Sequence, residues 1–338
     1  MTETPSIFRR RVAVILNPVS GQWRGRRRAR RLLERLAAAG ASASLHPTSG
    51  PGDARASAAR MASQSDLLIS VGGDGTLNEV LNGLLDSGAR TPVLVLASGT
   101  ANMVARELGL PSHPAELAAA GLSGPVRRLD AGLVVPPPRS GEAAAARRFV
   151  LCAGAGFDAA VVEEVRRHRK GRGITELSYL LPLLATMRRY AFPPMRVLVD
   201  GDCVAEDAVY TVVSNTRRYA GPFFACPQAV SDDGLLDVCC LPRSSFLRMT
   251  CQALAMILRR MHRLPEARYR RGRRIELQSD REVPVQLDGD PAGGLPMRIE
   301  VVPSAVALCV PADSLPAPTL RQAGRTVAEG REQAGSGD

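Results

Sequence analysis

Three glycines and one aspartate separate an apolar run from an amphipathic pattern in VGGDGTLNEVLNG, Val71 to Gly83. The run before the glycines predicts a strand, and the apolar residues after them recur at helical spacing. Thr76 precedes Glu79 by three residues, the spacing of a capping box, so we expect the helix to begin there with its free amides in the turn. Glycines permit positive φ and a close anion, and a helix N-terminus favours negative charge. The turn therefore predicts a phosphate site.

Asp74 does not suit a plain phosphate cradle, because a bare carboxylate repels phosphate. It suits a site where Mg²⁺ lies between the carboxylate and the phosphate, or where the carboxylate orients a water or hydroxyl. Either use indicates a nucleoside triphosphate. The Walker A pattern is absent, so a P-loop enzyme is excluded. A glycine-rich turn with an incidental aspartate is the alternative.

Two further turns follow apolar runs, NPVSG (Asn17 to Gly21) and SGTANMVARELGLP (Ser98 to Pro111). The surrounding pattern alternates short apolar runs with helical patterns, which predicts a doubly wound α/β sheet. In such a sheet, ligands bind at the carboxyl ends of the strands, where these turns should converge with the glycine turn.

The elements expected in this first half are strands at 11–16, 43–46, 66–71 and 92–97, and helices at 23–39, from 53, and after the glycine turn. From Val126 the sequence reads as antiparallel strands, among them 297–302 and 305–310, with Asp200 and Gly201 as a hairpin turn. Residues 136–148 are expected to form an exposed hairpin loop. Helical patterns interrupt the strands at 157–168, 175–189 and 244–262. The expected organisation is a nucleotide-binding α/β domain over 10–125, a β-rich lipid or substrate domain over 126–312, and a disordered tail over 313–338.

The composition narrows the class of protein. The chain has 338 residues, 45% of them hydrophobic, and a net charge of +11, which suits anionic partners. Only 4% are aromatic, and no basic run carries interleaved aromatics, so nucleic-acid binding is not expected. Seven scattered cysteines indicate neither a disulfide framework nor a zinc site, and no apolar stretch is long enough to span a bilayer. We expect a cytoplasmic protein, soluble or attached peripherally to a membrane.

The motifs NPVSG, GGDGTLNEV, GTANMVARELG, AGFDA and DDGLLDV together resemble the diacylglycerol kinase catalytic family, over about residues 11–311. The resemblance implies a nucleotide-binding α/β domain followed by a β-sandwich-like domain, ATP in the cleft, and a lipid hydroxyl as acceptor. It also implies nucleotide contacts through Asn17, Ser20, Gly21, Thr48, Gly72, Gly73, Asp74, Gly75, Thr76, Leu77, Asn78 and Thr100. Family members often carry Asp where this chain has Met103, so one polar contact there is expected to be missing.

Two acidic turns gain a role from the same resemblance. In AVSDDGLLDV the family's bacterial members hold a structural Mg²⁺, which places Asp233 and the carbonyls of Val230 and Leu235 as ligands; an ordinary turn is the alternative. In VQLDGDP the family commonly reads D-G-E. The resemblance makes Asp290 the proton acceptor, with Asp288 orienting the hydroxyl or a metal-bound water, while a plain hairpin turn is the alternative.

Several hypotheses about function stay open. An NAD kinase-like enzyme with a soluble substrate and an inactive nucleotide- or membrane-binding protein are the rival functions, and the sequence does not name the lipid. CAGAGFDAA formally matches a dinucleotide fingerprint, but no acidic residue follows at the required distance. We expect instead a tight turn that lets Phe157 and Asp158 line the cleft between the domains. Basic clusters at 166–172 and 259–274 predict contact with an anionic membrane surface. The sequence leaves a homodimer open.

Overall fold

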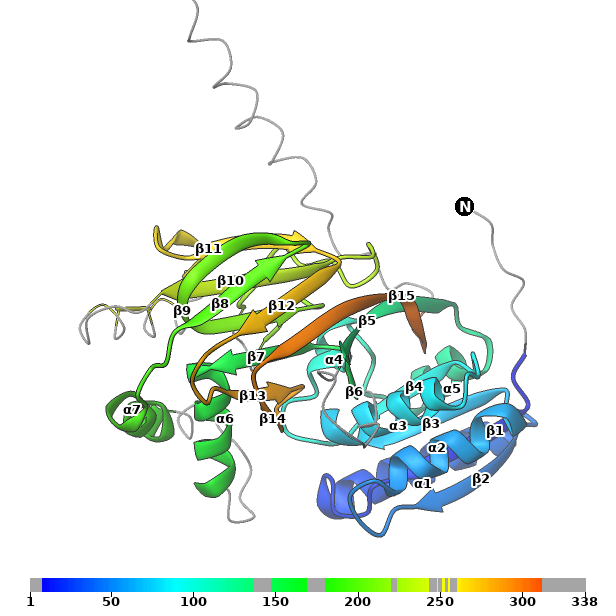
Figure 1. The fold of residues 1–338 in the computed structure, drawn as a ribbon. Coiled ribbons are helices and arrows are strands. Elements are labelled where there is room, and N and C mark those ends of the chain that lie inside the picture. Colours follow the sequence, from blue (N-terminus) through cyan, green and yellow to red (C-terminus); the bar gives the residue numbers. More distant parts are fainter. Residues whose placement is uncertain are drawn as a thin grey trace, which may run out of the picture.

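The computed structural model describes residues 8–135, 147–168, 180–219, 224–242, 248, 251–252, 255 and 260–311. Strands and helices alternate in the first half of the chain, and strands dominate the second (Figure 1). The first half contains β1 (Arg11–Leu16), α1 (Gln22–Ala38), β2 (Ser42–Pro47), α2 (Asp53–Met61), η1 (Ala62–Gln64), β3 (Leu67–Gly72), α3 (Asp74–Asp86), β4 (Val93–Ala97), α4 (Met103–Glu107) and α5 (Pro114–Ser123).

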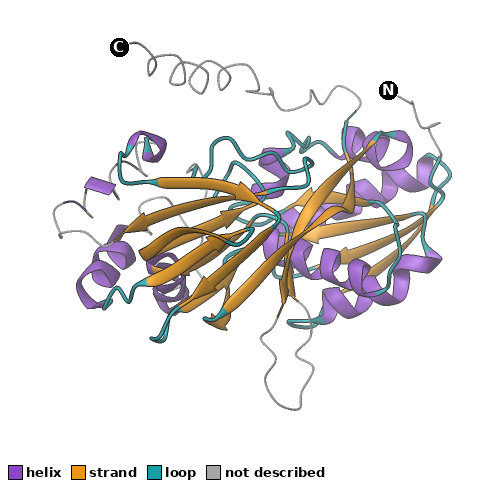
Figure 2. Ribbon diagram, turned by 45° about the horizontal axis from the view of Figure 1, so that its top comes forward, coloured by secondary structure: helices purple, strands orange, loops and turns teal. Residues whose placement is uncertain are grey.

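The strands of this half pair in parallel in the order β2-β1-β3-β4. Successive side chains of each strand point to opposite faces of the sheet, and helices cover both faces. Val12 and Val14 of β1 pack with apolar residues of α1 and α5, whereas Ala13 and Ile15 pack with those of α2 and α3. Figure 2 shows helices on both sides of this part of the sheet. The predicted doubly wound fold is confirmed; α5 was not predicted, although Pro114 in its first turn is typical of a helix start.

The second half is mostly antiparallel. It contains β5 (Val126–Val135), β6 (Arg147–Phe149), β7 (Cys152–Gly156), α6 (Phe157–His168), α7 (Leu180–Arg189), β8 (Met195–Val199), β9 (Asp202–Ser214), β10 (Leu236–Pro242), η3 (Met261–Arg263), β11 (Arg268–Gly272), β12 (Arg274–Gln278), β13 (Pro284–Leu287), β14 (Asp290–Gly294) and β15 (Met297–Cys309). The predicted hairpin turn is confirmed: Asp200 and Gly201 have φ of 53° and 98° between the paired strands β8 and β9. This half is a β-sandwich-like domain with added helices.

The strand β15 joins the two halves. It pairs antiparallel with β12 and β5, and at its far end Leu308 lies in parallel register with Val93 of β4. The sequence predicted two strands here. The structure has one, because a bulge between Val302 and Val306 absorbs Pro303 without ending the pairing with β5.

Some predicted segments lie outside the described residues: the tail over 313–338, residues 136–146 of the predicted hairpin loop, residues 175–179 of one helix, and most of the predicted helix at 244–262. Strands β11 and β14 were not predicted, because one reads as a run of arginines and the other as turn residues. None of the helices in the described ranges has the length and apolar character needed to cross a membrane.

Candidate active site

The turns after β1, β3 and β4 lie in contact with one another. Asn17 Nδ2 donates to Thr76 Oγ1 at 3.0 Å, which joins the first turn to the central one. Ser98 Oγ donates to Ser20 Oγ at 3.2 Å, which joins the third turn to the first. The strands end at the same edge of a parallel sheet, so their turns converge as the sequence predicted.

The glycines of the central turn serve close packing. Gly72, Gly73 and Gly75 all have negative φ, so the prediction that they supply positive φ is wrong. A Cβ on Gly72 would collide with the side chain of Thr76, and a Cβ on Gly99 would lie 2.5 Å from the Cα of Gly73. The turns can approach this closely only because these positions carry no side chain.

In the first turn a positive φ is required. Gly21 has φ of 68°, and a Cβ there would lie 2.5 Å from the carbonyl oxygen of Ser98. Any other residue would therefore be strained and would push the third turn away.

The predicted capping box is wrong. Helix α3 begins at Asp74, two residues before Thr76, and no side chain caps it. Glu79 turns away to α2, where it accepts hydrogen bonds from the amides of Gly52 at 3.0 Å and Ala54 at 3.1 Å. The first amides of α2 have no partner within their own helix, and Glu79 lies close enough to accept from them. The first amides of α3 are therefore left without a side-chain cap, which suits an anion.

Asp74 ties the central turn to the third one. Its Oδ1 accepts hydrogen bonds from the amides of Met103 at 2.7 Å and Val104 at 3.4 Å, so the carboxylate caps α4. Burial raises the pKa of Asp74, and these backbone hydrogen bonds oppose the rise. At Met103, where the family often has Asp, the side chain is 3% exposed, and the backbone amide is the group that donates to Asp74.

Asp288 holds two parts of the site together. Its Oδ2 accepts from Asn78 Nδ2 at 2.7 Å and from the amide of Val150 at 3.0 Å, and its Oδ1 accepts from the amides of Leu151 and Cys152, both at 2.9 Å. Burial raises the pKa of Asp288 to about 6 against these donors. The sequence predicted that Asp288 orients a hydroxyl or water, but the structure gives its carboxylate four protein donors.

Asp290 has an exposed carboxylate beside the central turn. Its side chain is 61% exposed, and among the described residues it forms an ion pair with Arg166, whose Nη1 lies 3.8 Å from Oδ1. A Cβ built on Gly75 would lie 3.9 Å from Asp290 Oδ2, so this carboxylate faces the first turn of α3. Of the two predicted acidic residues, Asp290 is the one placed to meet a ligand bound at that turn.

A buried pair that the sequence did not predict supports the acidic turn. Gln286 Oε1 accepts from the amide of Gly289 at 2.7 Å, and Gln286 Nε2 donates to Asp158 Oδ2 at 2.9 Å. Burial raises the pKa of Asp158 to about 7. The sequence signal was available: Gln286 is a polar residue at a buried position of an otherwise apolar strand. Asp158, expected to line the cleft, is instead 3% exposed.

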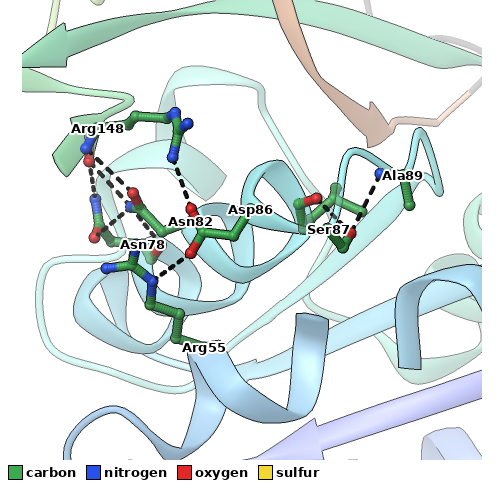
Figure 3. Close-up of polar contacts among 8 residues, drawn as sticks. Arg55, Asn78, Asn82, Asp86, Ser87, Ala89 and Arg148 are labelled. Atoms are coloured by element: carbon green, nitrogen blue, oxygen red, sulfur yellow. Dashed lines mark hydrogen bonds and ion pairs between the residues drawn. The ribbon is translucent and has the colours of Figure 1, made fainter. Parts of the chain in front are cut away.

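Helix α3 connects the two halves along its length (Figure 3). Asn78 and Asn82 donate to the carbonyl oxygen of Arg148 in β6, at 3.2 Å and 3.0 Å. Asp86 pairs with Arg55 of α2 at 2.6 Å and with Arg148 at 2.9 Å. The helix that begins at the glycine turn is therefore fixed to both halves.

The remaining predicted nucleotide residues differ in what they can offer. Leu77 is 2% exposed and packs in the core, so only its backbone could contact a ligand. The Thr48 amide donates to the carbonyl of Leu16 at 2.8 Å, which holds the turn after β2 against β1. Thr100 is exposed in the third turn. The Asn78 side chain is occupied by Asp288.

In the turn around Asp233, the carboxylates of Asp233 and Asp237 share a single arginine among the described residues. Asp233 accepts from the amide of Leu235 at 3.2 Å and forms an ion pair with Arg271, which also lies 3.4 Å from Asp237. Burial raises the pKa of Asp237 to about 6; Arg271 opposes the rise and Asp233 adds to it. Asp237 Oδ2 is buried without a hydrogen-bond partner in the structure.

In the Mg²⁺ site expected from the family resemblance the carboxylate is Asp233, whose two oxygens are engaged by Arg271 and by the Leu235 amide. The oxygen left without a partner among the described residues belongs to the neighbouring Asp237. Within the described ranges, no three His, Cys, Asp or Glu side chains are grouped to hold a metal. The predicted set differs from such a group, because it has one carboxylate, Asp233, and the backbone carbonyls of Val230 and Leu235.

Known proteins match both halves of the chain. Residues 11–134 match the diacylglycerol kinase catalytic domain, and residues 152–310 match the YegS C-terminal NAD kinase beta sandwich-like domain. A diacylglycerol kinase from Mycobacterium tuberculosis (strain ATCC 25618 / H37Rv) is 28% identical over 305 residues, covering 89% of this chain and 95% of that protein. One from Bacillus subtilis (strain 168) is 28% identical over 293 residues, covering 85% and 92%.

A solved structure shares the fold. The crystal structure of a diacylglycerol kinase from Bacillus anthracis str. Sterne is 21% identical, with a TM-score of 0.67, and the match covers 93% of this chain and 100% of that one. The two-domain arrangement described above is therefore found in that protein as well.

Proposed function

Because the chain belongs to the diacylglycerol kinase catalytic family, we propose that it is an ATP- and Mg²⁺-dependent lipid kinase. It transfers the γ-phosphoryl group to a hydroxyl of a diacylglycerol-like or sphingoid lipid. The observation that carries this proposal is the position of Asp290, whose free carboxylate faces the uncapped first turn of α3. A phosphate-binding turn opposite a free carboxylate is what a kinase with a hydroxyl acceptor needs.

The residues of this chain would divide the reaction as follows. Amides at the start of α3 bind the phosphates, and the packed glycines let them come close to the backbone. Mg²⁺, when bound with ATP, neutralises phosphate charge, and Asp74 is the carboxylate placed to support it. Asp290 accepts the proton of the lipid hydroxyl as the hydroxyl oxygen attacks the γ-phosphorus, and ADP leaves with the β,γ-bridging oxygen. Asp288 positions the turn that carries Asp290.

Labelled ATP and a total lipid extract test this function. Wild-type protein is expected to label a lipid, and Asp74→Asn is expected to abolish the transfer while the fold survives, because asparagine can still cap α4 but carries no charge. Circular dichroism and the melting temperature check the fold. With NAD added to the same assay, label in NADP instead of a lipid would favour the NAD kinase-like alternative. Tight ATP binding without transfer would favour an inactive binding protein. Near-normal turnover by Asp74→Asn would contradict its role.

A structural Mg²⁺ at Asp233 is a separate part of the proposal. The partnerless oxygen of Asp237 and the charge shared through Arg271 support it. Added Mg²⁺ should raise the melting temperature of wild-type protein but not that of Asp233→Ala, because a ligand that binds only the folded state stabilises it. Equal responses of the two proteins would argue against the site.

We also propose peripheral attachment to anionic membranes through the basic clusters at 166–172 and 259–274. Arg166 and Arg167 at the end of α6 have side chains 63% and 67% exposed, and β11 adds exposed arginines on a strand that pairs only with β10 among the described strands. Exposed charges are screened over about 8 Å at physiological salt, so vesicle binding should require anionic lipid and weaken as salt rises. Equal sedimentation with neutral and anionic vesicles would exclude it.

A further inference from the structure

A cavity of about 450 Å³ lies at the opposite end of α3 from the glycine turn. Its floor is apolar and comes from the last turn of α3 and from β15, with Leu84, Leu85, Val302, Ala305 and Ala307 among the lining residues. Leu84, the first helix residue that lines the cavity, comes ten residues after Asp74 in α3, which corresponds to about 15 Å along the helix. The cavity is therefore distinct from the candidate active site.

Two arginines line the cavity and have no ion pair among the described residues. Arg90 follows α3, Arg128 belongs to β5, and both are exposed. The α3 C-terminus would ordinarily oppose an anion there. Its carbonyls are already engaged, because Leu84 O accepts from Ser87 Oγ at 2.6 Å and Leu85 O accepts from the Gly88 amide at 3.2 Å. Figure 3 shows Ser87 at this end of the helix. Positive charge therefore dominates the cavity.

The wall formed by β15 is fixed in place. Ser304 lies in the bulge with φ of 51°, and its amide donates to Asp130 Oδ1 at 2.7 Å. Asp130 is 1% exposed, and its other oxygen accepts from the amide of Gly234 at 2.7 Å. A buried carboxylate with donors on both oxygens holds the bulge open, so a ligand would meet a formed cavity.

We propose that this cavity is a second binding site, for a phosphate monoester that carries an apolar group. Two guanidinium groups match the two charges of a phosphate monoester, and the fork of each can bind two of its oxygens. The apolar floor calls for a hydrocarbon part beside the phosphate. The volume lies within the usual range of small-molecule sites, about 300–1,000 Å³. Such binding does not depend on whether the chain is a kinase.

Calorimetry with dihexanoyl phosphatidic acid, at a concentration where it is monomeric, tests the site. Wild-type protein should bind it more tightly than inorganic phosphate, which leaves the floor uncovered, and more tightly than dihexanoyl phosphatidylcholine, which lacks the monoester. Arg90→Ala and Arg128→Ala should each weaken binding at least tenfold, because a hydrogen bond to a charged group contributes about 1.5–3 kcal/mol. Arg35→Ala removes an exposed arginine of α1 and should have no effect.

Two further measurements locate the ligand. Ala305→Phe should abolish binding by filling the cavity while both arginines remain. Hydrogen exchange should slow in peptides covering 84–90 and 301–307. The proposal is overturned if all three cavity variants bind like wild type, or if protection appears only at 72–78 and 286–291. Equal affinity for inorganic phosphate would reduce the site to an anion site and contradict the apolar part.

Discussion

Asp290→Asn is expected to slow single-turnover phosphoryl transfer by about 10²-fold or more at saturating ATP, the range for removal of a general base. The physical reason is that the amide cannot accept the proton of the lipid hydroxyl. ATP affinity and the melting temperature should change little, because the Asp290 side chain is 61% exposed and makes only a long contact with Arg166.

Two variants control this experiment. Asp290→Glu restores the residue that the family commonly carries and should keep transfer, since a longer carboxylate can still reach the hydroxyl. Asp280→Asn removes an exposed carboxylate from the loop before β13 and should transfer at the wild-type rate. Wild-type transfer by Asp290→Asn would mean that the base lies elsewhere.

Asp288→Ala should lower the free energy of unfolding by about 3 kcal/mol or more, because three backbone amides and the Asn78 side chain lose their acceptor. Urea unfolding measures this as a lower midpoint with an unchanged slope. Asp290→Ala is the matched control two residues away, and its exposed side chain predicts a change within about 0.5 kcal/mol. A midpoint for Asp288→Ala equal to that of Asp290→Ala would show that the four hydrogen bonds contribute nothing to stability.

These two aspartates also show where sequence reasoning stops. The turn VQLDGDP identifies both as candidates, and only the family resemblance assigned Asp290 as acceptor and Asp288 as the orienting residue. Their surroundings differ because the donors to Asp288 come from residues 78 and 150–152, which are remote in sequence, whereas Asp290 meets none of them. The capping box failed for the same reason: Glu79 has the right local spacing, but the amides of α2 lie within its reach.

What could be predicted rests on local periodicity. Apolar runs gave β1, β3 and β4, and parallel strands place their turns at one edge, so the convergence of Asn17, Thr76 and Ser98 followed without knowledge of tertiary contacts. The glycines of the central turn stay predicted nucleotide contacts, but the expectation that they supply positive φ was wrong. Their use depends on how closely two turns approach, which is a property of the folded protein.

The return of β15 to the first half affects how the protein folds during synthesis. Val306 and Leu308 belong to the same core as Val93 and Leu84, so the half that carries the glycine turn leaves the ribosome with a strand and part of its interior missing. Most domains can fold in the order in which they are made. The pairing of β15 with β4 and β5 joins residues distant in sequence, which slows closure of this half. A nascent chain that already contains the turns after β1, β3 and β4 therefore still lacks the strand that completes their core.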